Sequence, residues 1–182
     1  PSVWALGFWW KGMVVCSADN GGVWHHPALR GQYSGCNVTS ADHNYNWWDA
    51  IHGQVGPASA PNPCGFNSNV PCDDFGHGTH TTGTMVGSDG VSNQIGMAPG
   101  ATWIACRNMD RGWGSPSTYI ECLQFFIAPT DLTGKNPDPA RRPQVINNSY
   151  NCPPKEGCQA NSLSDAIQQV RAAGIFMSVA AG

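Results

Sequence analysis

The chain reads Met13-Val-Val-Cys-Ser-Ala-Asp19-Asn-Gly-Gly22 near its beginning, and this segment indicates the fold class. The residues before Asp19 are mostly apolar and show no strict polar alternation, a pattern typical of a strand buried on both faces of a parallel sheet. Later runs share this pattern. We therefore expect strands at Met13–Ala18, Thr102–Arg107, Gln144–Asn148 and Ile175–Ala180.

Helical patterns lie between the later strands. The segment Thr118–Ile127 follows Ser115-Pro-Ser, a favourable helix start, and repeats apolar residues at helical spacing. The segment Ser164–Ala173 keeps its apolar residues on one face and is closed by Gly174. Because strands and helices alternate, the sequence predicts an α/β fold with a mainly parallel central sheet.

Composition and charge fit one globular domain. The 182 residues are enough to bury a core, and no apolar run approaches the roughly 18 residues of a membrane span. The net charge of −3 comes from few charges of either sign, so we expect neither a nucleic acid nor a membrane as a partner. The polar, proline-rich segments Gln32–Asp73 and Ala128–Pro143 predict long loops.

Eight cysteines in a chain of this size indicate an oxidising compartment, and we expect a secreted, extracellular protein. The favoured pairs are Cys64 with Cys72, Cys152 with Cys158 and Cys106 with Cys122, while the pairing of Cys16 and Cys36 stays open. Zinc is the alternative, but the chain has no Cys-x-x-Cys unit and no Cys–His set with finger spacing. Because the chain starts at Pro1 without a signal peptide, we expect a processed or recombinant mature form.

A second segment places a histidine between two glycines: Asp73-Asp-Phe-Gly-His77-Gly-Thr-His80-Thr-Thr-Gly-Thr-Met-Val-Gly87. A lone histidine here, or an aspartate before Asn-Gly-Gly, would also fit an ordinary structural role. The whole string, however, resembles the His signature of the subtilisin family, G-H-G-T-H-x-x-G-T. The segment around Asp19 resembles the family's Asp signature, a strand followed by D-T-G and then H-P. Asp19 falls seven residues before His26-Pro27, and the order Asp then His is that of the subtilisins.

The resemblance continues along the chain. Gly96–Ala101 resembles the family's G-x-A-P-x-A segment, and Val145–Tyr150 is similar to the V-I-N-x-S segment that lines the substrate cleft. Ala172–Gly182 resembles the strand that leads to the oxyanion-hole asparagine. The segment Asn147–Cys158 resembles a cysteine-containing branch of secreted bacterial subtilases.

The resemblance implies a three-layer subtilisin-like fold and a serine endopeptidase that hydrolyses polypeptide substrates through an Asp-His-Ser triad. His77 would act as the general base, and Asp19 would hold its imidazole in the required tautomer. Two backbone segments would clamp a peptide as an added β-strand. Their residues are Arg111, Gly112, Trp113, Gly114, Ser149, Tyr150 and Asn151. The chemistry requires no cofactor, and structural Ca²⁺ is expected only as a family habit.

A few residues depart from the family pattern, which bears on the fine geometry and the specificity of the site. Asn20 stands where Thr is usual, Gly22 where Val is typical, and Asn151 where Gly usually lies at the mouth of the S1 pocket. The other polar residues near the motifs are interpreted as structural. These are Asp73, Asp74 and His80, together with His25, His26, His43 and His52 in surface or loop roles.

The chain ends at Gly182, where the family pattern would next supply the oxyanion asparagine and later the G-T-S-x-A-x-P motif. We therefore expect residues 1–182 to be the N-terminal part of a subtilisin-like peptidase domain, incomplete at the C-terminus and active only with its C-terminal remainder. The alternative is a non-catalytic fragment or pseudoenzyme that keeps a peptide-binding cleft. In the complete domain Ile175–Ala180 should be an interior strand, apolar on both faces, so in this chain we expect a sheet edge and an apolar face to be uncovered. The isolated chain should therefore not form a stable monomer.

Overall fold

The computed structural model describes residues 2–37, 39–57 and 61–182. Its strands are β1 (Val14–Asp19), β2 (Trp47–Asp49), β3 (Thr102–Arg107), β4 (Val145–Asn148) and β5 (Phe176–Val179). Its α-helices are α1 (Ser2–Ala5), α2 (Pro27–Arg30), α3 (His77–Val86), α4 (Pro116–Ile127) and α5 (Ser164–Ala172). The 3-10 turns η1 (Pro139–Arg141) and η2 (Pro154–Glu156) lie in the later loops.

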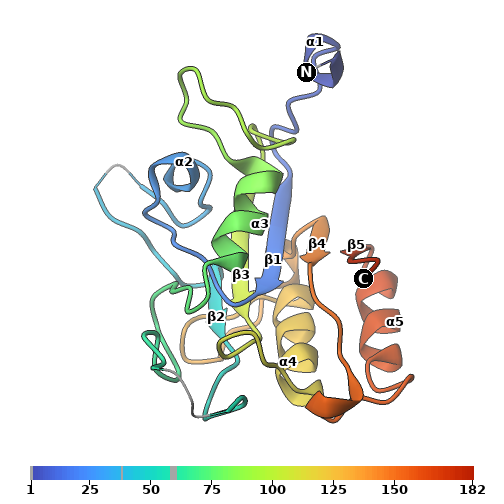
Figure 1. Ribbon diagram of the computed structural model, residues 1–182. Coiled ribbons are helices and arrows are strands. Elements are labelled where there is room, and N and C mark those ends of the chain that lie inside the picture. Colours follow the sequence, from blue (N-terminus) through green and yellow to red (C-terminus); the bar gives the residue numbers. More distant parts are fainter. Residues whose placement is uncertain (1, 38, 58–60) are drawn as a thin grey trace.

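The strands form one parallel sheet in the order β2-β3-β1-β4-β5 (Figure 1). In the register of this sheet, Arg107 of β3 lies opposite both Asp19 of β1 and Asp49 of β2. Charged side chains therefore meet at the carboxyl edge of neighbouring strands. This edge is where parallel sheets collect catalytic groups and ligands.

Helices cover both faces of the sheet. Alternate residues of the central strands point to opposite faces, so each face has apolar side chains that pack against helices. On one face, Cys16 and Ile104 pack with the apolar sides of α4 and α5. On the other face, Val15 and Trp103 pack with α2 and α3. The architecture is the three-layer α/β arrangement that the sequence predicts.

The structure differs from the prediction at one edge of the sheet. β2 lies within Gln32–Asp73, where the sequence favours a loop, and it forms because its residues pair with β3. At the opposite edge the expectation is confirmed, because β5 leaves a sheet edge and an apolar face uncovered. Among the described residues it pairs with β4 alone, and Phe176 and Val179 are 67% and 66% exposed. This edge consequently presents an apolar surface to solvent.

The three disulfides have the pairing that the sequence favours over zinc. Cys64–Cys72, Cys106–Cys122 and Cys152–Cys158 have Cα–Cα distances of 5.7, 5.6 and 5.6 Å, within the range that a disulfide spans. The first disulfide lies in a loop before α3, the second joins β3 to α4, and the third lies in the loop after β4. The two remaining cysteines are free thiols. Cys16 is buried, which raises the pKa of its thiol, and Cys36 is half-buried.

Candidate active site

Asp19 is the last residue of β1, and its side chain is completely buried. One carboxylate oxygen, Oδ1, accepts a hydrogen bond from the backbone N–H of Asn20 at 2.8 Å, and Oδ2 accepts from the hydroxyl of Thr81 at 3.2 Å. Burial raises the pKa of Asp19 because the carboxylate loses its hydration, and hydrogen bonds, chiefly from His77, offset only part of this rise. Asp19 is therefore a desolvated acceptor in a fixed orientation.

His77 is the first residue of α3, and Asp73 fixes the turn that leads into it. Asp73 Oδ1 accepts from the N–H of Gly76 at 2.7 Å, and Oδ2 accepts from the N–H and the hydroxyl of Thr79 at 2.7 and 2.6 Å. These bonds satisfy amides that the first turn of a helix leaves without partners. Asp73 therefore has a structural role, because its carboxylate caps the helix that carries His77.

A close approach between two backbones places His77 against Asp19. A Cβ atom on Gly78 would lie 2.1 Å from the carbonyl oxygen of Gly21, a distance that no side chain tolerates. Glycine at position 78 therefore lets the start of α3 lie directly on the turn that follows β1. This contact explains why the histidine motif needs a glycine immediately after the histidine.

Asp19 and His77 form a hydrogen-bonded pair. His77 Nδ1 lies 2.8 Å from Oδ1 and 3.0 Å from Oδ2 of Asp19. An ionised carboxylate only accepts, so Nδ1 donates and the lone pair of the neutral ring lies on Nε2. In the described part of the chain no group forms a hydrogen bond with Nε2. The His77 side chain is 39% exposed, so the pair is shielded at the carboxylate and open at the imidazole.

A cleft of about 240 Å³ opens beside His77. Besides His77 it is lined by Asn20, Phe75, Met109, Gly112, Ser149, Tyr150, Asn151, Pro153, Lys155 and Glu156. Four predicted substrate-binding residues are in this lining: Gly112, Ser149, Tyr150 and Asn151. They lie in the loops after β3 and β4, at the same edge of the sheet as Asp19.

The other predicted substrate-binding residues, Arg111, Trp113 and Gly114, are not part of the cleft lining. The Trp113 ring packs against Lys155, whose Nζ lies 4.4 Å from the ring centroid. Gly114 lies against Tyr119, since a Cβ there would be 2.2 Å from the Tyr119 ring. Trp113 and Gly114 therefore pack against residues next to the cleft, and the substrate-binding role of Arg111, Trp113 and Gly114 stays a prediction.

One wall depends on residues that the motifs did not reveal. Tyr119 of α4 stacks on Tyr150 with ring centroids 4.5 Å apart and planes 6° from parallel. The Tyr119 hydroxyl donates to Glu156 at 2.6 Å. Burial raises the pKa of both tyrosines, so their hydroxyls remain neutral donors. The sequence signal was weak, because a tyrosine at an apolar position of a helix is usually a core residue.

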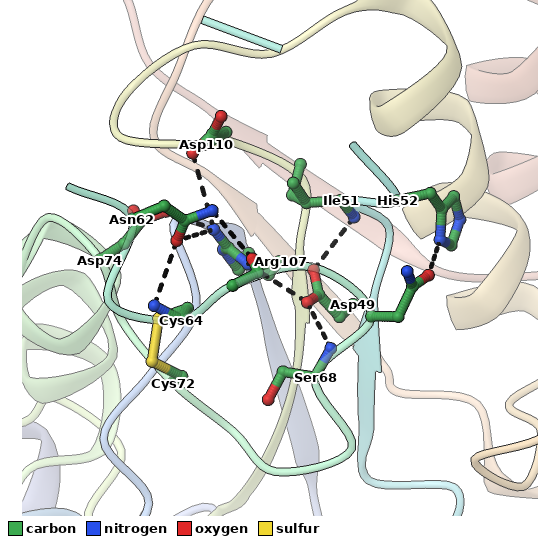
Figure 2. A network of polar contacts seen from close by, with 12 residues as sticks. Asp49, Ile51, His52, Asn62, Cys64, Ser68, Cys72, Asp74, Arg107 and Asp110 are labelled. Carbon is green, nitrogen blue, oxygen red and sulfur yellow. Dashed lines mark hydrogen bonds and ion pairs between the residues drawn. A yellow bond between two sulfur atoms is a disulfide. The ribbon is translucent and has the colours of Figure 1, made fainter. Parts of the chain in front are cut away.

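Arg107, the last residue of β3, is completely buried among carboxylates, and the sequence analysis did not single it out (Figure 2). Its guanidinium nitrogens lie 3.2 Å from Asp49, 2.5 Å from Asp74 and 3.8 Å from Asp110. Asp110 also accepts two hydrogen bonds from the Arg111 side chain, both at 2.8 Å. Burial raises the pKa of Asp110, but these hydrogen bonds and the two arginine charges outweigh that effect and lower it overall.

Arg107 also holds the loop that contains the first disulfide. Its guanidinium donates to the carbonyl of Gly65 at 3.0 Å and to Oδ1 of Asn62 at 3.1 Å. Asp49 accepts from the N–H of Ser68 at 2.8 Å. Figure 2 shows Arg107 between Asn62 and Asp49, with the Cys64–Cys72 bond next to Asn62 and Ser68 next to Asp49. The loop is therefore fixed by an ionic centre as well as by a covalent bond.

The remaining histidines lie away from the cleft. His26 accepts from the N–H of Ala28 at the start of α2, His43 hydrogen-bonds Tyr33 at 3.0 Å, and His52 hydrogen-bonds Glu121 at 2.8 Å. Within residues 2–37, 39–57 and 61–182, no group of three or more His, Cys, Asp or Glu side chains is arranged to hold a metal ion.

Two of the departures from the family signature have structural reasons. A Cβ on Gly22 would lie 3.3 Å from the Trp103 ring, so the indole occupies the space that a larger residue would need. The longer side chain of Asn20 reaches Asp74, to which its Nδ2 donates at 3.1 Å. The third departure, Asn151, lines the cleft.

Comparison with known proteins agrees with this geometry. The family model described as "Subtilase family" matches residues 10–182. Bacillopeptidase F of Bacillus subtilis (strain 168) is 39% identical over 188 residues, covering 100% of this chain and 12% of the relative. Subtilisin-like protease 6 of Trichophyton tonsurans is 32% identical over 118 residues, covering 64% of this chain and 26% of the relative. The chain thus spans only a small part of the curated relatives it matches.

Solved structures share the fold. A protease of Pseudoalteromonas arctica PAMC 21717 superimposes with a TM-score of 0.64 at 21% identity, covering 100% of this chain and 52% of that one. Fervidolysin of Fervidobacterium pennivorans gives 0.60 at 17% identity, covering 100% and 22%.

The parallel sheet with helices on both faces and the Asp–His pair at its carboxyl edge define a subtilisin-like α/β protein. The family match makes the assignment specific: the chain belongs to the subtilase family. Among the helices that the structure describes, none has the length and apolar character needed to cross a membrane.

Proposed function

We propose that the protein carrying this chain is a secreted serine endopeptidase, and that the chain supplies the aspartate and the histidine of an Asp-His-Ser triad. The observation that carries this proposal is the Asp19–His77 pair, with Nδ1 2.8 Å from Oδ1 and the imidazole open to a cleft. Membership of the subtilase family supports the reaction class. The disulfides support secretion, because disulfides persist in oxidising compartments.

The geometry fits proton transfer by His77. Its Nε2 would accept the proton of a serine hydroxyl as that hydroxyl attacks the scissile carbonyl, and would return the proton to the leaving amine. Asp19 would keep the proton on Nδ1 and stabilise the imidazolium that forms between these steps. The burial of Asp19 favours this role, since an electrostatic contact is stronger where water is excluded.

The cleft fits an extended polypeptide. Its lining combines Gly112 from the loop after β3 with Ser149, Tyr150 and Asn151 from the loop after β4. Backbone groups of such segments can pair with a substrate strand, as in other proteins that bind peptides by adding a strand. The substrate class that we propose is therefore a polypeptide held in extended conformation.

We propose that the nucleophilic serine and the oxyanion donor lie outside residues 1–182, in the C-terminal remainder of the same peptidase domain. No serine hydroxyl in the described ranges forms a hydrogen bond with His77. The apolar surface of β5 supports the proposal, since Phe176 and Val179 are 67% and 66% exposed and strands of this kind are usually covered. Structural Ca²⁺ remains a proposal from the family alone, with no position assigned to it.

The proposal is tested on the longer natural protein with a fluorophosphonate probe and a chromogenic peptide. The wild type should label and hydrolyse the peptide, and H77A should lose activity by about 10⁶-fold, the magnitude known for subtilisin itself. H80A is the matched control, because His80 is an exposed histidine on the same helix and does not line the cleft. A wild-type protein that binds peptides but neither labels nor hydrolyses them would instead be a non-catalytic peptide-binding protein.

A further inference from the structure

We propose that Asp74 is a positioning residue that links the Asp19–His77 pair to the edge of the substrate cleft, and that Arg107 holds it in place. The role in catalysis rests on the proposed peptidase function. The link itself is a property of the structure, and it has tests that do not require activity.

The carboxylate of Asp74 joins segments that are far apart in the sequence. Its Oδ1 accepts from Nδ2 of Asn20 at 3.1 Å. Its Oδ2 accepts from the backbone N–H of Arg111 at 3.0 Å and from the guanidinium of Arg107 at 2.5 Å. The Asp74 side chain has no exposed surface. A single buried group therefore ties the end of β1, the end of β3 and the loop after β3 to the segment that leads into His77.

The partners of Asp74 are immediate neighbours of the site residues. Asn20 follows Asp19, donates its backbone N–H to that carboxylate and also lines the cleft. Arg111 precedes Gly112, which lines the cleft as well. A displacement of Asp74 would thus move the support of Asp19 and the support of the cleft edge together.

The conformation of Arg111 needs such support. Its φ of 51° lies in the left-handed region, which is costly for a residue with a side chain. Asp74 holds its backbone N–H at 3.0 Å, while Asp110 holds its Nε at 2.8 Å. Two buried carboxylates therefore hold the residue before Gly112, Asp74 at its backbone amide and Asp110 at its side chain.

Arg107 holds the carboxylate of Asp74 through its guanidinium. Its guanidinium is itself held by Asp49 at 3.2 Å and by the carbonyl of Gly65 at 3.0 Å. Asp49 contacts the same guanidinium, but its other partners are the backbone N–H groups of Ser68 and Ile51. Neither of these groups belongs to the cleft lining, so Asp49 provides a matched comparison for Asp74.

The first experiment compares D74N with D49N in the longer natural protein. Each variant removes one carboxylate from Arg107, and kinetics are measured at a temperature at which both are folded. D74N should lower kcat/KM by about 10- to 100-fold, because small displacements of catalytic groups have effects of this size. The loss should include a lower kcat, because the support of Asp19 is disturbed, and a higher KM, because the support of the cleft edge is disturbed. D49N should stay within about threefold of the wild type. Equal losses in the two variants would overturn the proposal.

A second measurement is independent of activity. In D74N the amide of Arg111 should exchange its hydrogen at least about tenfold faster than in the wild type, because its acceptor is weakened. The amides of Ser68 and Ile51 should change in D49N instead. If the wild type proves inactive, the peptidase proposal fails while this exchange experiment still tests the link. An Arg111 amide that stays equally protected in D74N would overturn the link.

N20S provides a variant that leaves the Asp74–Arg107 pair intact and strands no buried charge. It should lower kcat, because it removes the Nδ2–Asp74 contact of the residue that follows Asp19. The Arg111 amide should stay as protected as in the wild type, because Asp74 still accepts from it. Combined with D74N it should add little further loss of kcat, as expected for two residues that act through one contact. Fully additive losses would show that Asn20 and Asp74 act separately and would contradict the proposal.

Discussion

Two ionic centres lie at the carboxyl edge of neighbouring strands, and they differ in their access to solvent. Asp19 of β1 pairs with His77, whose side chain is 39% exposed. Arg107 of β3 pairs with Asp74, and neither side chain has any exposed surface. The two centres are close, because Asp19 and Arg107 are opposite each other in the sheet register.

The difference shows that one sheet edge can hold two kinds of centre, one with an accessible polar group and one that fixes the surrounding chain. Among the described residues, the Asp19–His77 pair leaves one ring nitrogen without a hydrogen-bond partner, as the proposed proton transfer requires. The Arg107 centre directs its guanidinium at several acceptors, including Gly65 and Asn62, and is closed to solvent. The closed centre can hold the surroundings of the open one without taking part in its chemistry.

The largest effect on this comparison should come from D19N. Asparagine would offer its amide N–H to Nδ1 and favour the wrong tautomer, so kcat should fall by about 10⁴-fold. Stability should change in the opposite sense. Burial raises the pKa of Asp19, so ionisation of Asp19 in the folded state costs stability at pH values above that raised pKa.

D19N should therefore melt no lower than the wild type at neutral pH. The difference between the two proteins should vanish as the pH falls below the aspartate pKa of the unfolded chain, about 3.9. Calorimetry across this range and steady-state kinetics provide the measurement. A D19N protein that keeps its activity but melts far lower would contradict the comparison, because Asp19 would then stabilise the fold rather than take part in the reaction.

The next effect in size should come from R107M, which removes the charge but keeps much of the side-chain volume. It leaves Asp49, Asp74 and Asp110 buried without their shared cation, and such a loss costs about 3–5 kcal/mol of unfolding free energy. The loss should shrink at acid pH, where protonated carboxylates need no cation. Denaturant unfolding at two pH values measures both effects.

R141M is the matched control for R107M. Arg141 pairs with Asp138 at 3.1 Å, but their side chains are 55% and 42% exposed. An exposed pair of this kind contributes about 0–1 kcal/mol. If R141M and R107M destabilise the protein equally, the buried Arg107 centre contributes no more to stability than an exposed ion pair.

The smallest effect should come from C64S/C72S. The bond closes a short loop with a sequence separation of 8, and its removal should cost about 2–3 kcal/mol. Because Arg107 binds the Gly65 carbonyl in the same loop, R107M and C64S/C72S together should destabilise less than the sum of their separate effects. Thermal unfolding of the variants, with C36S as a control for loss of a free thiol, gives the answer. Strict additivity would show that the loop and the ionic centre are independent.

The sequence predicts the open centre well and the closed centre poorly. Asp19 and His77 each lie in a local motif, and strand order brings the two motifs to one edge. Arg107 ends a strand, where an arginine is most often solvated, and nothing local shows that it is buried. Its partners Asp49 and Asp74 lie in other segments, so the pairing appears only when the chain is folded.

The edge strand β2 is hard to predict from the sequence for a related reason. The three residues of β2 are too few for a periodic pattern, and the strand depends on pairing with β3 and on a hydrogen bond from Trp47 to the carbonyl of Ser68 at 2.7 Å. The apolar pattern of Ile175–Ala180 predicts a strand correctly. Whether both of its faces are covered depends on neighbours that the pattern does not contain.

The contact between Gly78 and the Gly21 carbonyl bears on how this protein can evolve. Even a single added methyl group would collide with backbone there, at 2.1 Å, so this position offers no variation for selection to act on. The lining of the cleft is different at exposed residues such as Asn151 and Lys155, whose side chains can change in size and charge. In the proposed peptidase, new substrate preferences should therefore arise by substitution at such positions, while the junction beneath His77 stays the same across descendants.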